Sequence, residues 1–370
     1  MPDKHFRFIA NDAFIAAFIA AFIAAFIAAF IAAFIAAFIA AFIAAFIAAF
    51  IAIDTRNTSM SRTHCYVCRL ALFAALSAFL FSPAAATAQT KLEWKFKTGQ
   101  QVIQEVEQIM DMTMAFGERK IKTAMIQKID TTWKVESVDD KGTAKIAQAI
   151  TRLRMTMKSD AGVQLEFDSN EDKDKELEGI AAAIGPALKG LAKAKFLVTM
   201  NRQGTIEEVE ISEETLASFK AIPGAAQMGG MFSKEGLINL IKQSGTNFPA
   251  KEIENGANWK KASEIKLPQV GSMKSEATMT YKGSTQADGK TLQRIDVDLA
   301  LDLVPGDNAQ AKIVLKDQRA DGKLLFDNET GWLTESEMNQ VMTMQITAGP
   351  TVIEQVLEQQ IRAKMVWPKN

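Results

Sequence analysis

Apolar and polar residues alternate along most of the chain after residue 89, and this alternation is the strongest constraint on its fold. In the clearest run, apolar residues at 295, 297, 299, 301 and 303 alternate with Asp296, Asp298 and Asp302. Successive side chains of a β-strand point to opposite faces, so the run predicts a strand with one apolar and one polar face. Comparable runs begin near residues 102, 120, 143, 277 and 332. One-sided strands must bury their apolar face, which predicts a mainly antiparallel sheet packed on one side.

The middle of the chain, about residues 170–245, has helical spacing instead of alternation. Apolar residues from Leu177 to Leu188 recur three or four positions apart. Ser212 and Ser233 each stand shortly before glutamates, which is typical of helix N-caps. We therefore expect an α+β fold: about ten antiparallel strands in a curved sheet or half-open β-barrel, with helices inserted mid-chain that cover its concave face.

Short glycine-containing segments predict the turns between strands. Asp139–Gly142, Asn201–Gly204, Asp288-Gly289 and Asp321-Gly322 all carry residues that favour tight turns. The C-terminal segment, residues 352–367, fits both strand alternation and helical spacing. Because a Gly-Pro pair before it suggests a hairpin, we predict a strand there.

Residues 60–88 have the three-part pattern of a cleavable secretory signal peptide. Basic residues precede an apolar run from Leu70 to Phe81, and small residues at 86–88 precede Gln89. The apolar run has 12 residues, fewer than the ~20 that span a bilayer. We expect cleavage after Ala88, which leaves residues 89–370 as a single β-rich exported domain. That domain would be periplasmic or extracellular and would have no stable membrane span.

Residues 1–59 are dominated by a low-complexity repeat. Residues 13–52 are ten identical copies of Ala-Phe-Ile-Ala. As one helix, this stretch would extend about 60 Å, twice the thickness of the bilayer core, and its period of four fits no stable supercoil. Because a signal peptide normally begins its chain, we expect Met60 to be the true start and residues 1–59 to be a start-site artefact, helical or disordered. A membrane hairpin or an amyloid-like stack of strands is the alternative.

The expected exported domain contains no His and no Cys, since His5, His64, Cys65 and Cys68 all precede residue 89. This excludes Ser-His-Asp and Cys-His nucleophiles and the usual ligand sets for zinc, copper, haem and iron–sulfur clusters. Carboxylate acid–base chemistry, a Ser–Lys pair and an oxygen-ligated Ca²⁺ remain open. With 37 Lys and Arg against 40 Asp and Glu, residues 89–370 have a formal net charge of −3, which gives no strong attraction to nucleic acid or to an anionic membrane. We expect no cofactor, no nucleic-acid partner and no enzymatic activity.

Four turn-and-strand segments are distinctive: Leu92–Gly99, Val135–Gly142, Pro249–Trp259 and Phe326–Leu333. Together they resemble an uncharacterised family of exported bacterial proteins, a domain of unknown function. The resemblance covers nearly all of residues 90–370 and implies no catalytic residues. The predicted architecture is also similar to the periplasmic lipoprotein-carrier fold, a half-barrel closed by helices, and this similarity concerns the fold alone.

Methionine is concentrated at positions that the alternation places on the inner face of the sheet. Its side chain is flexible and suits a cavity that accepts acyl chains of varying shape. The alternative is that the same residues fill a core between sheet and helices. The candidate ligand-binding residues are Met110, Met112, Met114, Met155, Met157, Met279, Met338, Met342 and Met344.

Two acidic groups are further candidates. The segment from Asp168 to Asp174 resembles the start of a Ca²⁺ loop, but Lys173 and Gly179 replace the Gly and Glu that such a loop needs, so a helix cap is favoured. A second group is favoured as a solvated outer face, with carboxylate-based hydrolysis as the alternative; it comprises Asp296, Asp298, Asp302, Glu335 and Glu337.

The sequence therefore predicts an exported, non-enzymatic protein that binds a lipid or other amphiphile in a Met-lined cavity. The alternative is a structural or protein-interaction module of the cell envelope, with a filled core and an envelope protein as its partner. An inner face open to ligand distinguishes the first hypothesis from the second.

Overall fold

A computed structural model describes residues 89–368, except 172–184, 186–187, 221–232, 246, 268–270, 307–311 and 349–350. Its strands join in one antiparallel sheet of twelve strands. Their bounds are β1 Gln101–Phe116, β2 Arg119–Val138, β3 Ala144–Ser159, β4 Gln164–Asp168, β5 Lys195–Met200, β6 Ile206–Ile211, β7 Asn258–Leu267, β8 Gly271–Ala287, β9 Lys290–Pro305, β10 Lys312–Asp327, β11 Trp332–Ala348 and β12 Thr351–Val366.

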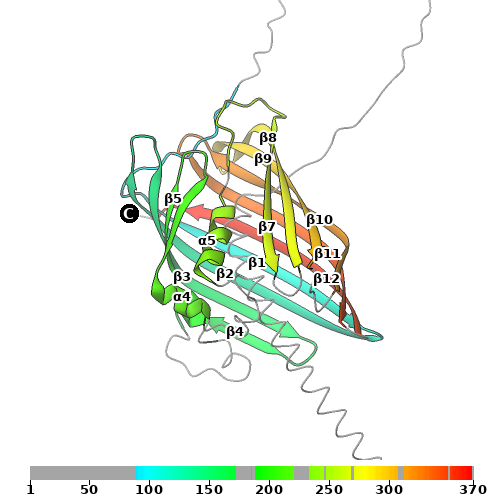
Figure 1. Cartoon of the computed structure of the whole chain (residues 1–370). Helices are drawn as coiled ribbons and strands as arrows, with labels where there is room; N and C mark the ends of the chain where they lie inside the picture. The colour runs from blue at the N-terminus through cyan, green and yellow to red at the C-terminus, as the bar shows by residue number, and fades with distance from the viewer. Residues whose placement is uncertain are drawn as a thin grey trace, which may run out of the picture.

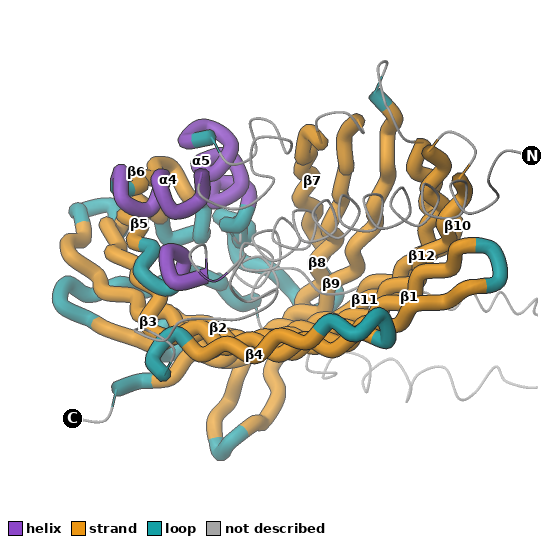
Figure 2. Tube along the Cα trace, turned by 90° about the horizontal axis from the view of Figure 1, so that it is seen from below, coloured by secondary structure: helices purple, strands orange, loops and turns teal. Residues whose placement is uncertain are grey.

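Strands β1 and β12, the first and last in chain order, pair with each other at the centre of the sheet (Figure 1). From this seam, β1, β2, β3, β5 and β6 follow in order toward one edge, with β4 pairing on β3. Strands β12, β11, β10, β9, β8 and β7 follow toward the other edge. Two meanders are thus joined by strands that are more than 200 residues apart in the chain. Figure 2 shows that the sheet curves into an open trough whose walls are the two outer sets of strands.

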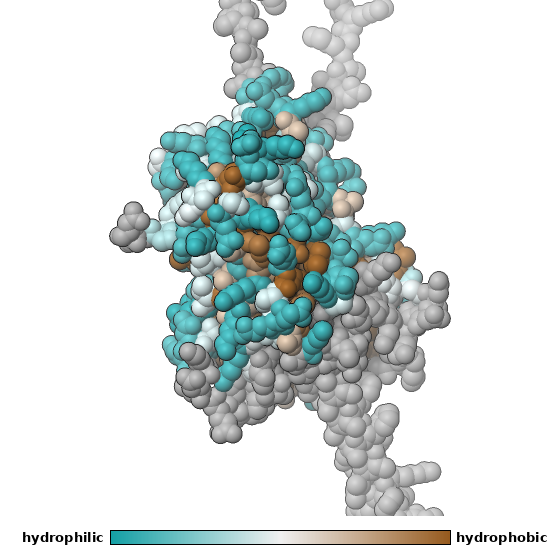
Figure 3. Space-filling view, turned by 60° about the vertical axis from the view of Figure 1, so that its left-hand side comes forward, coloured by the Kyte–Doolittle hydropathy of each residue, from teal (hydrophilic) through white to brown (hydrophobic). Residues whose placement is uncertain are grey.

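Two helices, α4 (Glu213–Lys220) and α5 (Lys234–Gln243), lie on the concave side along the wall that contains β5 and β6 (Figure 2). Both begin where the sequence predicts. The Ser212 hydroxyl accepts from Thr215 N at 3.2 Å, and the Ser233 hydroxyl accepts from Gly236 N at 3.0 Å. Each cap satisfies an amide that the first turn leaves free. The helices place Leu216, Phe219, Leu237 and Leu240 in the core beneath them. The described surface on this side of the molecule is mainly hydrophilic, with smaller hydrophobic patches (Figure 3).

Residues 89–100, which we call the N-terminal strap, cross one end of the trough. Trp94 N donates to Arg202 O at 2.8 Å in the β5–β6 turn, and Lys95 N donates to Gly331 O at 3.2 Å in the β10–β11 turn. Thr90 pairs with Ile253, just before β7. The strap therefore joins turns that belong to opposite walls of the trough.

Aromatic rings fill the space under the strap and form what we call the aromatic plug: Trp94, Phe96, Trp133, Phe248, Phe326 and Trp332. Trp94 stacks on Phe96 with ring centroids 5.7 Å apart and meets the edges of Phe326 and Trp332 at 5.8 and 5.5 Å. Such pairs contribute about 0.5–1.5 kcal/mol each beyond the area they bury. The plug closes the end of the trough at which β1 begins and β12 ends.

The fold expected from the sequence is confirmed: an open, curved, mainly antiparallel sheet with few helices. The C-terminal segment is a strand, β12. The turn predicted at Asp321-Gly322 is wrong, because both residues lie inside β10 and pair with Asn339 and Met338 of β11. The expected signal peptide, the Ala-Phe-Ile-Ala repeat and most of the helix expected between Leu177 and Leu188 lie outside the described residues.

Candidate functional site

The pairing register places all nine candidate methionines on the concave face. Residues directly opposite each other in an antiparallel pair point to the same side of the sheet. One unbroken row across the sheet contains Met155, Gln127, Gln108, Ile361, Met338, Gly322, Val297, Met279 and Trp259. The next rows contain Met110 with Met157, then Met112 with Met342, and then Met114 with Met344.

The methionines divide into two groups by their packing. Met110, Met155, Met157, Met279 and Met338 belong to the main core. Met112 and Met114 form a separate cluster with Ile353, against which Phe116, Ile346 and Leu357 pack. Met342 and Met344 lie in the same rows and are partly exposed. We call these four, Met112, Met114, Met342 and Met344, the Met end of the trough. It lies opposite the aromatic plug, where β1 ends and β12 begins.

Polar side chains lie between the plug and the Met end, and we call Gln104, Gln127, Thr131 and Gln148 the polar floor. All four are at most 4 % exposed. No hydrogen-bond partner within the described protein reaches Gln127 Nε2 or Oε1, Gln104 Nε2, Gln148 Nε2 or Thr131 Oγ1. Each buried polar group without a partner costs about 1–3 kcal/mol. The floor is therefore either expensive to maintain or satisfied by a group outside the described residues, such as water or a ligand.

The inner face of the central strands carries no charge. Inward positions of β1 from Val102 to Phe116 are Val, Gln, Met and Phe, and those of β12 from Ile353 to Met365 are Ile, Gln, Leu, Ala and Met. The inward positions of β2 from Ile121 to Val135 are likewise uncharged. This surface is suited to hydrocarbon and to uncharged polar groups.

One wall of the trough loosens near the Met end. The pairing of β9 with β10 stops at Asp298 and Asp321. Beyond this point the Gln318 side chain connects the strands: its Oε1 accepts from Leu301 N at 3.0 Å, and its Nε2 donates to Leu299 O at 3.4 Å. A side chain thus replaces part of the backbone ladder.

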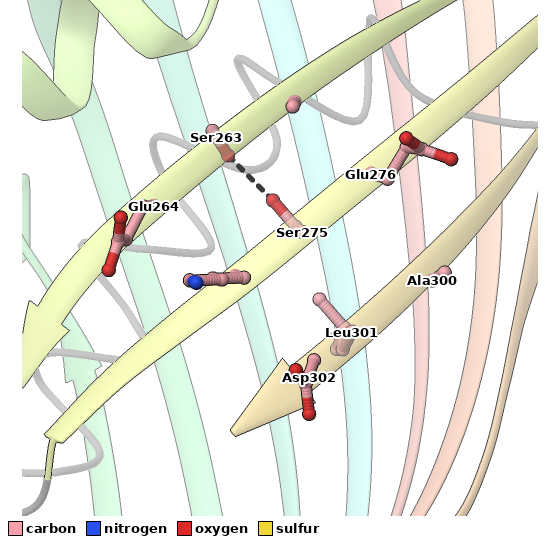
Figure 4. A pocket seen from close by; sticks show the side chains of 9 residues that line it. Ser263, Glu264, Ser275, Glu276, Ala300, Leu301 and Asp302 are labelled. Atoms are coloured by element: carbon pink, nitrogen blue, oxygen red, sulfur yellow. Dashed lines mark hydrogen bonds between the residues drawn. The ribbon is translucent and has the colours of Figure 1, made fainter. Parts of the chain in front are cut away.

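A hollow of about 450 Å³ lies on the same wall, where β7, β8 and β9 run together (Figure 4). Ser263 and Ser275 face each other there with hydroxyl oxygens 2.6 Å apart, beside Leu301. Glu264, Lys274 and Asp302 form the neighbouring row on the opposite face. The hollow lies in a single layer of strands near a sheet edge.

The convex face carries ladders of opposite charges. Glu107 pairs with Lys128 at 2.6 Å, Asp130 with Arg154 at 2.8 Å, and Glu337 with Lys323 at 3.1 Å. All of these residues except Lys323 line a hollow of about 650 Å³ on the outside of the seam. The acids at 296, 298, 302, 335 and 337 share this face, as expected for a solvated surface, and Asp296 is bonded to Arg294.

Asp168, the first residue of the Ca²⁺-like segment, is held by an arginine. Arg152 Nη2 lies 2.5 Å from Asp168 Oδ2, and its Nε also donates to the carboxylate. The hydrogen bond from Arg152 lowers the pKa of Asp168. Asp168 Oδ1 also accepts from Asn170 N at 3.0 Å, the pattern of a turn cap. The remainder of that segment, from residue 172, is outside the described residues.

Among the described cationic residues, Lys261 of β7 has the pKa that is shifted furthest. Its ammonium donates to Gln243 O and Gly245 O, at and just beyond the C-terminal end of α5. Burial lowers the pKa of Lys261 from 10.5 to about 8. A cation at this position satisfies carbonyls that the last helical turn leaves free and complements the helix dipole. Lys261 therefore ties α5 to the far wall of the trough.

No three His, Cys, Asp or Glu side chains among the described residues gather closely enough to hold a metal ion. No helix in the described part of the chain is long and apolar enough to cross a membrane.

Neither the polar floor nor the strap was predicted from the sequence. Gln104 and Gln127 do occupy inward positions of the alternating pattern, and a polar residue at an apolar position is a signal that the sequence carries. The strap is not visible in the pattern, because its contacts join turns that are remote in sequence.

Known proteins provide one match of sequence and several weak matches of structure. Lipovitellin, in a structure titled for its lipid–protein interactions, overlaps 75% of this chain at 8% identity and a TM-score of 0.39. A DUF1329 family protein from Desulfovibrio piger overlaps 71% of this chain and 85% of its own, at 10% identity and a TM-score of 0.15. A putative outer membrane lipoprotein-sorting protein domain from Vibrio parahaemolyticus overlaps 69% of this chain and 83% of its own, at 11% identity and a TM-score of 0.14.

At such low TM-scores, these structural similarities do not indicate a function. The chain spans about a quarter of lipovitellin, 26% of its length. The comparison with curated proteins found no match. The sequence match is firmer, because a model described as a family of unknown function (DUF6263) matches residues 141–333, just over half of the chain. This range includes β3 to β10 and both helices, and it confirms the resemblance drawn from the turn-and-strand segments. The chain therefore belongs to the DUF6263 family of unknown function.

Proposed function

We propose that this protein is an exported, non-enzymatic binding protein that holds a lipid or other amphiphile along the concave face of its sheet. One observation carries the proposal. The inner face of β1, β2 and β12 is uncharged from the aromatic plug to the Met end, where Met342 and Met344 remain partly exposed. Flexible apolar side chains that are partly exposed suit a ligand of varying chain length.

The second candidate function is a structural or protein-interaction module of the envelope. Its support is the packing of Met110, Met155, Met157, Met279 and Met338 in the main core. In that case the inner face is filled, and the charged convex face meets a partner protein. The two functions differ in whether the purified protein carries a small apolar molecule.

Native mass spectrometry of protein purified from an exporting host without detergent tests the proposal. We expect a protein mass that begins at Gln89, with added mass that organic extraction removes. A chain that retains residues 1–88 would contradict the predicted export, and a homogeneous ligand-free mass would favour the interaction module.

Substitutions at the Met end locate the bound molecule. Met112→Asp and Met342→Asp each place a charge on the apolar surface and should abolish the added mass. Ile126→Asp is the matched control, because Ile126 lies on β2, is 43% exposed and points to the convex face. Circular dichroism shows which variants remain folded. A folded Met112→Asp protein that keeps its ligand would contradict this location.

A further inference from the structure

We propose that the polar floor binds the carbonyl groups of an uncharged acyl ester, so that the ligand is a neutral acylglycerol-type lipid. This inference rests on the proposed function and names its ligand class. The unpartnered polar atoms of the floor, the uncharged inner face around them and their place in the trough all support it.

The floor presents mainly hydrogen-bond donors. Gln104, Gln127 and Gln148 each have an unpartnered Nε2 amide, and the Thr131 hydroxyl is also without a partner in the described protein. On β11, Nε1 of the plug residue Trp332 and Ser336 Oγ also have none. Acceptors without partners are fewer, with Gln127 Oε1 among them. A group rich in donors matches a ligand rich in acceptor oxygens, and an ester offers two such oxygens without a charge.

The surroundings select against a charged head group. The inward positions of β1, β2 and β12 carry no lysine or arginine, and Asp327 is the sole charged side chain among the buried residues that the structure describes. A carboxylate or phosphate buried here would lack a counter-ion, which is far more costly than a buried neutral carbonyl. The floor thus favours an ester over a free fatty acid.

The order of features along the strands fits a lipid lying lengthwise. On β1, Gln104 and Gln108 are followed by Met110, Met112 and Met114 toward the open end. At about 3.3 Å per residue, Gln108 to Met114 extends about 20 Å. One lipid tail occupies about half of a bilayer core of ~30 Å. The head would therefore contact the floor beside the plug, and the tail would lie along the Met end.

Competition among three C18 compounds tests the inference. The protein, stripped of lipid by organic extraction and refolded, is loaded with the apolar fluorophore diphenylhexatriene, which is then displaced by monoolein, oleate or octadecene. We expect monoolein to bind at least tenfold more tightly than octadecene, and oleate to bind more weakly than monoolein. Displacement by oleate at lower concentration than monoolein would overturn the inference.

Variants assign the effect to the floor. Gln127→Met keeps the side-chain length and removes two polar atoms that have no partner in the described protein. It should therefore raise the melting temperature of the lipid-free protein and weaken the binding of monoolein about tenfold. Octadecene affinity should not change. Thr131→Val is a second, smaller variant with the same expected direction. Gln360→Met is the control, because Gln360 lies on the convex face and bonds to Asn339 and Glu337.

The outcomes separate this inference from the proposed function. If diphenylhexatriene and all three compounds fail to bind, the proposed function fails. If octadecene and monoolein bind equally and Gln127→Met changes neither affinity, the trough binds hydrocarbon and the inference about the floor is wrong. A lowered melting temperature with unchanged monoolein affinity would also overturn it, since the Gln127 amide would then have a structural role.

Discussion

In the turn from Asp327 to Gly331, both the backbone conformation and the close contact with the strap disfavour a side chain at Gly331. Its φ of +70° lies in the left-handed region, and a Cβ there would stand 2.5 Å from Lys95 N of the strap. Asp327 Oδ1 accepts from Glu329 N and Thr330 N, and its other oxygen meets Lys290 Nζ at 3.2 Å. Burial of Asp327 would raise its pKa, but these hydrogen bonds together hold that pKa below its ordinary value.

Gly331→Ala should therefore cost more stability than a left-handed conformation alone explains. We expect about 3 kcal/mol or more, because the added methyl displaces the strap and uncovers Trp94. Gly289→Ala is the matched control, since Gly289 has a φ of +75° with open space around it. The control should cost only about 1 kcal/mol. Urea unfolding measures both, and equal losses would contradict the close approach of the strap.

Lys261 should make the stability of the protein depend on pH in the alkaline range. Below pH 8 the ammonium is charged in both the folded and unfolded chains and adds no slope. Between pH 8 and 10.5 the unfolded chain binds more protons, so the free energy of unfolding should rise, by up to about 3 kcal/mol. The variant Lys261→Met should lack this rise. Parallel pH profiles of the two proteins in denaturant titrations would show that Lys261 is not the cause.

Among the single elements, β9 and β10 are connected by the Gln318 side chain where their backbone pairing stops. Replacing Gln318 by Ala removes the acceptor of Leu301 N and the donor to Leu299 O. We expect a loss of about 1–2 kcal/mol and faster hydrogen exchange at the Leu301 amide. Gln286→Ala, which removes an exposed bond to Thr291, is the control. Unchanged protection at Leu301 would mean that Gln318 does not connect the strands.

The sequence predicts these elements well where local chemistry decides them. Alternation locates the long strands, and Ser212 and Ser233 begin α4 and α5 as their capping positions imply. Asp321-Gly322 has turn composition but continues β10, because pairing with strands on both sides outweighs local preference. The actual turn follows five residues later, where the Asp327 carboxylate caps free amides.

From the sequence, only the side of the sheet on which the candidate site lies could be predicted. Alternation gives the side of the sheet on which a methionine points, so all nine candidates share the concave face. It does not give neighbours across strands, so the division between Met110 in the core and Met112 at the Met end was not visible. The strap and the aromatic plug depend on contacts between distant turns, which no local pattern encodes.

At the scale of the whole molecule, pairing of β1 with β12 makes the two meanders one folding unit. Every residue of β1 from Ile103 to Phe116 has a partner on β12. Deleting residues 351–370 should leave β1 with an unpaired edge and an uncovered apolar face, so the chain should not fold cooperatively. Deleting residues 369–370 alone is the control. Circular dichroism and limited proteolysis measure the result, and a stable truncated protein would mean that each meander folds on its own.

Because this seam pairs strands more than 200 residues apart, its contacts form only after a long loop closes. We expect this step to slow refolding to milliseconds to seconds or longer.

A neutral amphiphile bound as we propose lies along the concave face from the polar floor to the Met end. Its position can be measured with a photoreactive monoacylglycerol that carries a diazirine at the end of its tail, with the attachment sites mapped by peptide mass spectrometry. We predict cross-links on residues 110–116 of β1 and 341–346 of β11. Attachment to the convex face, or labelling that an excess of monoolein does not suppress, would show that the lipid does not lie there.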